Sequence, residues 1–245
     1  MKTLVIDIET SPNLAHVWSL WNQNVSLSQL QASSELLCFA AKWLREEDTF
    51  FYAQWSHTHS EMVQAAHKLL CEADAVMDYN GTTFDIPYLN KEFLIEGLNP
   101  PVPYAHIDLY KTVKKRFRFP SNKLDYVSRA MGFEGKVSHE GHELWVKVMA
   151  GDQDAQRRMK VYNIQDVVLL ERMYWQLRPW IPNHPNVALI DSQGTCTTCG
   201  SDNVVERESA YTAMSKFKEL QCVKCGSWMR ETTRTANTAR RGLTW

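Results

Sequence analysis

The sequence of 245 residues lacks any stretch that approaches the roughly 20 consecutive apolar residues of a transmembrane helix. The apolar run at its start is interrupted by Asp7 and Glu9, so it does not have the form of a secretory signal. Internal repeats and low-complexity tracts are also missing. These absences exclude a membrane partner and predict a cytoplasmic protein.

An excess of either charge is absent too, because 27 Lys and Arg residues oppose 28 Asp and Glu residues, for a formal net charge of −1. This balance argues against a protein that coats nucleic acid through a strongly basic surface. The hydrophobic content of 44% and the nine tryptophans suffice for a sizeable core. Because the chain exceeds the usual length of one domain, about 100–200 residues, we expect one main domain and a small appendage.

The alternation of apolar patterns predicts a mixed α/β main domain over residues 1–180. Strand patterns at 2–8, 36–44 and 49–55 indicate an antiparallel meander. Further along, helical spacing and short strands alternate, with helices at 60–72, 84–96, 123–131 and 154–177 and strands at 75–79 and 106–109. A proline-rich stretch predicts a linker at 181–193, followed by a small domain at 194–232 and a basic, disordered tail at 233–245.

Asp7 and Glu9 lie two residues apart at the end of the first strand pattern, so both carboxylates point to the same face of the strand. Two like charges side by side in an apolar setting require a proton or a cation between them, and hard divalent cations favour carboxylate oxygen. The alternative is a solvated strand end that caps the next turn.

Two further elements carry acids in positions that pair with the first. Asp85 follows a strand pattern within the segment Asp78–Leu89, although it could simply cap a helix. Tyr162 and Asp166 are four residues apart on a long helical pattern and therefore share one face. The apolar neighbours of Asp166 make a surface position for this acid difficult to explain.

Together, Asp7-x-Glu9, Asn80-x-x-x-Phe84-Asp85 and Tyr162-x-x-x-Asp166 resemble the three motifs of the DEDD (DnaQ-like) 3′–5′ exonucleases, which have an RNase H-like fold. The second block is similar to proofreading domains of family B DNA polymerases. The overall layout is similar to small exonucleases of bacteria and phages, which implies the cytosol of a bacterium or of a phage-infected host. The resemblance covers about residues 1–180.

The third motif resembles the tyrosine subclass, because Tyr162 stands four residues before the last acid and Val161 occupies the position of the histidine in the other subclass. The resemblance implies that Asp7, Glu9, Asp85 and Asp166 bind two Mg²⁺ or Mn²⁺ ions about 3.5–4 Å apart and that Tyr162 positions the attacking water. It implies hydrolysis of single-stranded 3′ ends to nucleoside 5′-monophosphates, with DNA favoured. A 3′–5′ exoribonuclease and a non-catalytic nucleic-acid adaptor of the same fold are the alternatives.

Several residues are candidates for substrate binding. Asn80 matches the family within the second motif, and we add Thr10 and Phe84 from the first two motifs. The segment 111–123 has six basic residues and no acid, with phenylalanines on which bases could stack, and we take from it Lys114, Lys115, Arg116 and Arg118. An ordinary surface loop is the alternative there. For Trp18 and Trp21 we favour core packing over a contact with the terminal nucleotide, and for Asp108 a structural cap.

Four of the six cysteines form two Cys-x-x-Cys-Gly pairs, Cys196 with Cys199 and Cys222 with Cys225. In a chain of cytosolic character, this spacing predicts one Zn²⁺ held by four thiolates in a zinc ribbon. An iron–sulfur centre and redox-active dithiols are the alternatives. The ribbon would bind nucleic acid through basic residues such as Lys224 or would dock a replication or repair protein.

Overall fold

The computed structural model describes residues 1–135 and 140–240. Its largest sheet has the strand order β5-β4-β1-β6-β7. The strands are β1 (Thr3–Thr10), β4 (Leu36–Trp43), β5 (Thr49–Ala53), β6 (Ala75–Asp78) and β7 (Ala105–Asp108). β4 is antiparallel to β1 and β5, whereas β6 is parallel to β1 and β7. The mixed α/β class and the antiparallel meander predicted from the sequence are confirmed.

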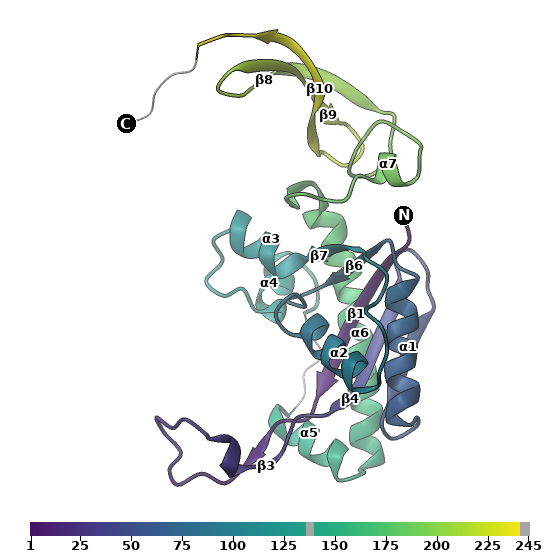
Figure 1. Cartoon of the computed structure of the whole chain (residues 1–245), viewed down its shortest axis with the longest axis vertical. Helices are drawn as coiled ribbons and strands as arrows, with labels where there is room; N and C mark the ends of the chain where they lie inside the picture. The colour runs from purple at the N-terminus through teal and green to yellow at the C-terminus, as the bar shows by residue number, and fades with distance from the viewer. Residues whose placement is uncertain (136–139, 241–245) are drawn as a thin grey trace.

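Helices cover both faces of this sheet, as Figure 1 shows. Leu4, Ile6 and Ile8 of β1 belong to a cluster with α1 (His59–Cys71) and α2 (Asp85–Ile95). Val5 points the other way, into a second cluster. That cluster includes α3 (Leu109–Arg116), α4 (Leu124–Ala130) and α6 (Gln153–Leu177). By the period of two in a strand, Asp7 and Glu9 continue the face of Val5 and point toward α6.

The helix α6 is held against the sheet by a buried ion pair that sequence reasoning missed. Lys42, in the otherwise apolar strand β4, pairs with Glu171 of α6, and both side chains are about nine-tenths buried. The other oxygen of Glu171 accepts the backbone N–H of Arg45 at 2.9 Å. At the other end of α6, the Asp152 side chain caps the helix by accepting the N–H of Ala155. These contacts fix the helix that carries Tyr162 and Asp166.

Three elements differ from the sequence-based expectations. The first part of the basic segment lies in the helix α3, and neither α3 nor α5 (His142–Met149) was predicted from the sequence. The chain after β1 forms an arm, residues 14–32, built on the short strands β2 (Leu14–Ala15) and β3 (Leu30–Ala32) and the 3-10 helix η1 (Leu27–Gln29). Trp18 is 96% exposed and Trp21 is 80% exposed on this arm. Their predicted place in the core is therefore wrong, because none of the residues of the arm, all of which are described, is buried.

After the 3-10 helix η2 (Arg178–Trp180) and the short helix α7 (Val187–Ile190), the chain forms a separate three-stranded sheet of order β10-β9-β8. Its strands are β8 (Val204–Tyr211), β9 (Ser215–Cys222) and β10 (Trp228–Asn237), and we call residues 194–237 the ribbon. Residues 233–237, predicted as part of a disordered tail, extend β10 instead, because they pair with β9. Residues 241–245 of that tail lie outside the described residues. No helix within the described parts of the chain has the length and apolarity needed to cross a membrane.

Candidate functional site

Three of the four predicted acids meet between β1 and α6. Asp7 and Glu9 come from the last part of β1, and Asp166 from the middle of α6. One carboxylate oxygen from each lies within 4.8 Å of the other two. Asp166 is only 1% exposed, whereas the two acids of β1 are partly buried. Carboxylate oxygens gathered this closely fit a hard divalent cation, which offsets the repulsion between them.

Tyr162 lies one helical turn before Asp166 on α6, on the face directed at the sheet. Its side chain is 6% exposed, and its ring packs edge-on against Trp145 of α5 at a centroid distance of 6.1 Å. The predicted common face of Tyr162 and Asp166 is present. The neighbouring helix α5 therefore supports the ring of the tyrosine that the third motif singles out.

Asn163, which sequence reasoning left without a role, contacts the acid group directly. Its Nδ2 donates to the Oδ2 of Asp7 at 2.7 Å and to the backbone oxygen of Asp7 at 3.2 Å. Asn163 is fully buried. An amide between Tyr162 and Asp166 on the buried face of the helix was the available indication, because a buried amide needs a polar partner. It holds the Asp7 carboxylate in one orientation.

Asp85, the fourth predicted acid, does not join this group of three. It starts α2, and its Oδ1 accepts the backbone N–H of Ile8, between Asp7 and Glu9 on β1, at 3.1 Å. Burial and, to a lesser extent, the nearby Asp78 carboxylate raise the pKa of Asp85 to about 7. A cation bound beside it would favour the ionised form.

The turn that follows β6 places Asn80 and Asp85. Gly81 donates its N–H to Asp78 at 2.9 Å, and a Cβ at Gly81 would lie 2.1 Å from the Asp78 Cγ, so only glycine fits there. Asn80 has a positive φ of 72°, and its N–H donates to Asp108 at 3.0 Å. Asp108 also accepts the N–H of Lys111 and so caps α3. The predicted structural role of Asp108 is confirmed, and it extends to the turn of the second motif.

Asp78 has a second partner that the sequence did not reveal. The Nε2 of His106, on the neighbouring strand β7, lies 2.5 Å from the Asp78 Oδ2. Burial opposes the charged imidazole, but the hydrogen bond and the charge of Asp78 outweigh it and raise the pKa of His106. Burial raises the pKa of Asp78 itself, against the effect of His106. The pair joins the carboxyl end of β6 to the neighbouring strand β7.

The predicted substrate residues Thr10 and Phe84 lie at the end of β1 and at the start of α2, respectively. Thr10 ends β1 and lines a cavity of about 340 Å³ with residues of α5 and its N-terminal flank, among them Trp145. Phe84 is 45% exposed beside Tyr88, at the start of α2.

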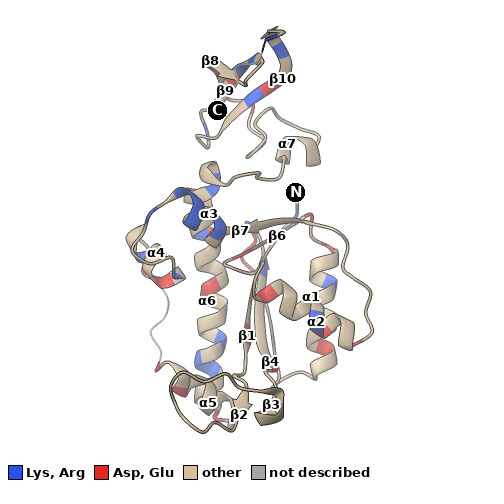
Figure 2. Cartoon of the chain, turned by 60° about the vertical axis from the view of Figure 1, so that its left-hand side comes forward, with Lys and Arg blue, Asp and Glu red and all other residues tan. Residues whose placement is uncertain are grey.

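The basic residues lie apart from these, at the end of α3 and just beyond it, as the blue of Figure 2 shows. Lys114, Lys115, Arg116 and Arg118 are all exposed. Phe117 and Phe119 instead pack toward the second core cluster, so they do not offer the stacking surface that the sequence suggested. The exposed cations at the last turn of α3 therefore do not have the rings of Phe117 and Phe119 available beside them for base stacking.

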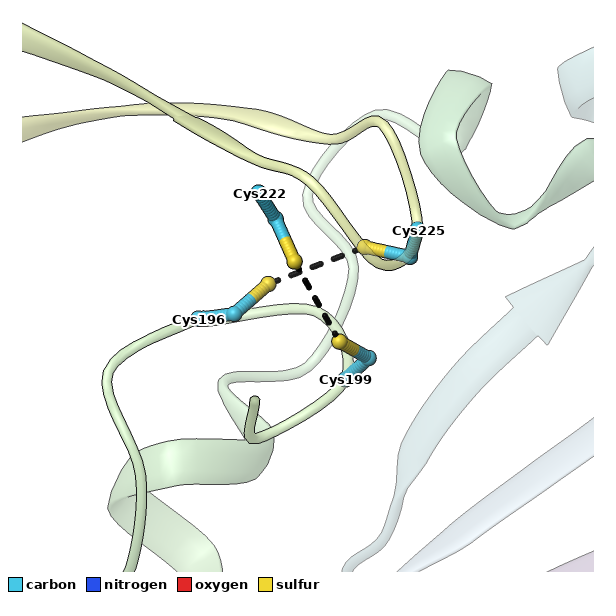
Figure 3. Close-up of side chains that lie close together, drawn as sticks. All are labelled: Cys196, Cys199, Cys222 and Cys225. Atoms are coloured by element: carbon cyan, nitrogen blue, oxygen red, sulfur yellow. Dashed lines mark hydrogen bonds between the residues drawn. The ribbon is translucent and has the colours of Figure 1, made fainter. Parts of the chain in front are cut away.

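The four cysteines of the ribbon point to one centre (Figure 3). Cys196 and Cys225 have their sulfurs 3.7 Å apart, and Cys199 and Cys222 have theirs 3.6 Å apart. These distances are far above the disulfide length of about 2.05 Å. They agree with the separation of about 3.8 Å between sulfurs at 2.3 Å from a tetrahedral Zn²⁺. The two predicted Cys-x-x-Cys pairs therefore form one four-cysteine cluster.

Comparison with known proteins identifies the class. Residues 28–178 match the model of the RNase H superfamily, and the chain belongs to this family. The superfamily supports a nuclease that acts on nucleic acid. Among curated protein sequences, none matches the chain.

A solved structure shares the fold. It is the family B DNA polymerase from the hyperthermophilic archaeon Pyrobaculum calidifontis, with a TM-score of 0.53 and 16% sequence identity. The match covers 73% of this chain and 25% of the polymerase. This chain thus matches only about a quarter of the polymerase's length. At this level of identity, the likeness shows a shared three-dimensional fold.

Proposed function

We propose that this protein is a metal-dependent 3′–5′ exonuclease that releases nucleoside 5′-monophosphates from single-stranded nucleic acid, with DNA as the preferred substrate. The observation that carries the proposal is the convergence of Asp7, Glu9 and Asp166 within 4.8 Å, in a chain of the RNase H superfamily. Polarity of digestion and the preference for DNA rest on the three sequence motifs and their resemblance to DEDD exonucleases of the tyrosine subclass.

In this proposal each residue has a distinct task. Asp7, Glu9 and Asp166, with Asp85 at their edge, hold Mg²⁺ or Mn²⁺, and Asn163 keeps the Asp7 carboxylate in its binding orientation. Two such ions, when bound, supply an activated water and stabilise the leaving 3′-oxygen. Tyr162 orients the attacking water through its hydroxyl, with its ring held by Trp145. Thr10 and its cavity receive the terminal nucleoside.

The test is digestion of end-labelled single-stranded DNA and RNA with Mg²⁺, with Mn²⁺ and with EDTA, resolved to single nucleotides. Stepwise release of mononucleotides from the 3′ end of DNA, abolished by EDTA, is the expected result. Hydrolysis confined to RNA would make the protein an exoribonuclease. Binding without hydrolysis would identify a non-catalytic adaptor, and internal cuts at the earliest times would contradict exonuclease action.

A matched pair of variants on α6 ties the activity to the site. Asp166→Asn removes one charge from the acid group, and we expect a loss of about 10³-fold or more in kcat. Asp154→Asn makes the same chemical change on an acid of the same helix that is 77% exposed and pairs with Arg157, so it should retain activity. Equal turnover in the two variants would overturn the assignment.

For the ribbon we propose one structural Zn²⁺ bound by Cys196, Cys199, Cys222 and Cys225. The sulfur distances and the small apolar interior support it, since Cys196, Phe217 and Cys222 are the only buried hydrophobic residues described there. Of its basic residues, Lys218 pairs with Glu206, and Arg230 stacks on Phe217. Lys224 is exposed and available to a phosphate or to an acidic partner surface, such as that of a replication or repair protein.

A further inference from the structure

A cavity of about 570 Å³ lies between the end of β6 and the starts of α3 and α4, and the function proposed above leaves it without a role. Tyr79, Asn80, Tyr110, Asn122, Lys123 and Leu124 line it. Its size falls in the range of sites that bind small organic ligands, about 300–1,000 Å³. We call it the tyrosine cavity.

The walls of the tyrosine cavity combine aromatic rings with polar groups. The rings of Tyr79 and Tyr110 meet edge-on at 5.7 Å. The Tyr79 hydroxyl donates to the backbone oxygen of Asn122 at 2.6 Å, which fixes that ring. The side-chain oxygen of Asn122 is buried and has no hydrogen-bond partner among the described residues, so it does not itself face a molecule in the cavity. Flat aromatic surface beside polar and cationic side chains is the chemistry that recognises single-stranded nucleic acid.

Cations lie at the mouth of the same cavity. Lys123 is exposed on its wall. The Nζ of Lys114 lies 5.8 Å from the centre of the Tyr110 ring, which connects the basic end of α3 to the aromatic wall. The one acid of the lining, Asp125, pairs with Arg129 at 3.0 Å. The phosphate of a nucleotide whose base lies in the cavity would therefore be near positive charge. Sites that bind single-stranded nucleic acid combine these two features.

The cavity also lies at the end of a strand that neighbours the one carrying Asp7 and Glu9. Asn80 reaches it from the end of β6, which pairs in parallel with β1, the strand that carries Asp7 and Glu9. Neighbouring strands lie about 4.8 Å apart, so the cavity begins a strand or two from the carboxylates along the same edge of the sheet. The cavity at Thr10 adjoins the end of β1 itself. One polynucleotide strand can therefore reach both.

We propose that the tyrosine cavity binds a base of the single-stranded substrate on the 5′ side of the scissile bond, stacked on Tyr110, with its phosphate near Lys114 and Lys123. This inference rests on the proposed exonuclease function. It assigns the aromatic contact to Tyr110, in place of the inward-facing Phe117 and Phe119.

The experiment compares a substrate long enough to enter the tyrosine cavity with one that is too short to do so. An oligothymidylate of ten nucleotides extends into the tyrosine cavity, whereas the 4-nitrophenyl ester of thymidine 5′-monophosphate contains a single nucleoside and does not. Tyr110→Leu keeps apolar volume but removes the stacking face. We expect its ratio of kcat/KM for the oligonucleotide to kcat/KM for the ester to fall about 5- to 100-fold, the range of one base–aromatic stack.

Two further variants separate stacking from structural damage. Tyr110→Phe keeps the ring and should restore the wild-type ratio. Tyr126→Ala removes a tyrosine of α4 that is 41% exposed and does not line the cavity, and it should leave both substrates unaffected. An unchanged ratio in Tyr110→Leu, or an equal fall in Tyr126→Ala, would overturn the inference.

A binding measurement distinguishes failure of this inference from failure of the proposed function. If the wild-type protein hydrolyses neither substrate, the exonuclease proposal fails. The cavity is then judged by fluorescence anisotropy of the labelled oligonucleotide with Ca²⁺ present. Weaker binding by Tyr110→Leu than by Tyr110→Phe supports the cavity, and equal binding contradicts it.

Discussion

The acid group between β1 and α6 and the cysteine cluster of the ribbon are both candidate metal sites. They differ in how much apolar core surrounds them. The acids come from residues 7, 9 and 166, and the extensive core clusters of the main sheet hold their elements in place. The cysteines come from two local pairs in a ribbon with very little apolar interior. The first site is organised by an apolar core, whereas the second lies in a ribbon with little core, where a bound metal would have to supply the missing stability.

Removal of the ribbon's metal should give the largest effect and should be confined to the ribbon. Cys222→Ser deletes one of the four thiolates, and structural Zn²⁺ contributes apparent free energies of about 10–16 kcal/mol in zinc-finger peptides. We expect loss of bound zinc and rapid proteolysis within 194–237, with retention of nuclease activity on short substrates. Zinc analysis and mass spectrometry of the digest measure this.

The control for that experiment is Cys71→Ser, a partly buried cysteine of α1 outside the ribbon. It should keep its zinc and its resistance to protease. Unfolding of the main domain together with the ribbon in Cys222→Ser would contradict the separation drawn here.

Loss of the buried pair should instead weaken the main domain. Glu171→Gln leaves Lys42 buried without its counter-charge, which costs about 3–5 kcal/mol in comparable cases. The double variant Lys42→Met, Glu171→Leu should recover most of that loss. Urea unfolding followed by tryptophan fluorescence measures both. Glu72→Gln removes one member of the exposed pair with Lys2 and should change the free energy of unfolding little. An equal loss of unfolding free energy in this variant would contradict the importance of burial.

A substitution of Asn163 tests whether the orientation of the Asp7 carboxylate matters, because it leaves the charge of the acid group unchanged. We expect Asn163→Ala to lower Mg²⁺-supported activity about 10- to 100-fold and to raise the Mg²⁺ concentration needed for half-maximal rate. Gln165→Ala, on the exposed face of the same helix, is the control. A fall in activity with an unchanged Mg²⁺ requirement would show that Asn163 does not act through Asp7.

The smallest effect concerns the pH dependence of stability. Because the pKa of His106 is raised in the folded protein, its pairing with Asp78 stabilises fully below the pKa of an unfolded histidine, about 6.5. The contribution is lost as pH rises through the higher pKa of the folded state. The difference in unfolding free energy between wild type and His106→Gln should therefore shrink from pH 5.5 toward pH 9, with about 6.5 as the start of the change. A difference that grows with pH would contradict the pairing.

Much of this architecture was predictable because its patterns are local. Continuous apolar runs indicated β1 and β4, and the helical spacing at 154–177 indicated α6 almost to its ends. The helix α3 was missed because four of its eight residues are basic, which leaves few apolar positions to show a helical pattern. The arm was misjudged because exposed tryptophans are rare, so Trp18 and Trp21 suggested a core that the arm does not have.

The sequence by itself determined the residue types and spacing of both candidate metal sites, because strand period, helix period and Cys-x-x-Cys turns are local geometry. Only the tertiary structure decided that Asn163 holds Asp7, that Asp85 accepts the backbone N–H of Ile8, and that His106 meets Asp78. Those contacts join residues up to 156 positions apart. They depend on how α6 and the sheet pack, which no local pattern specifies.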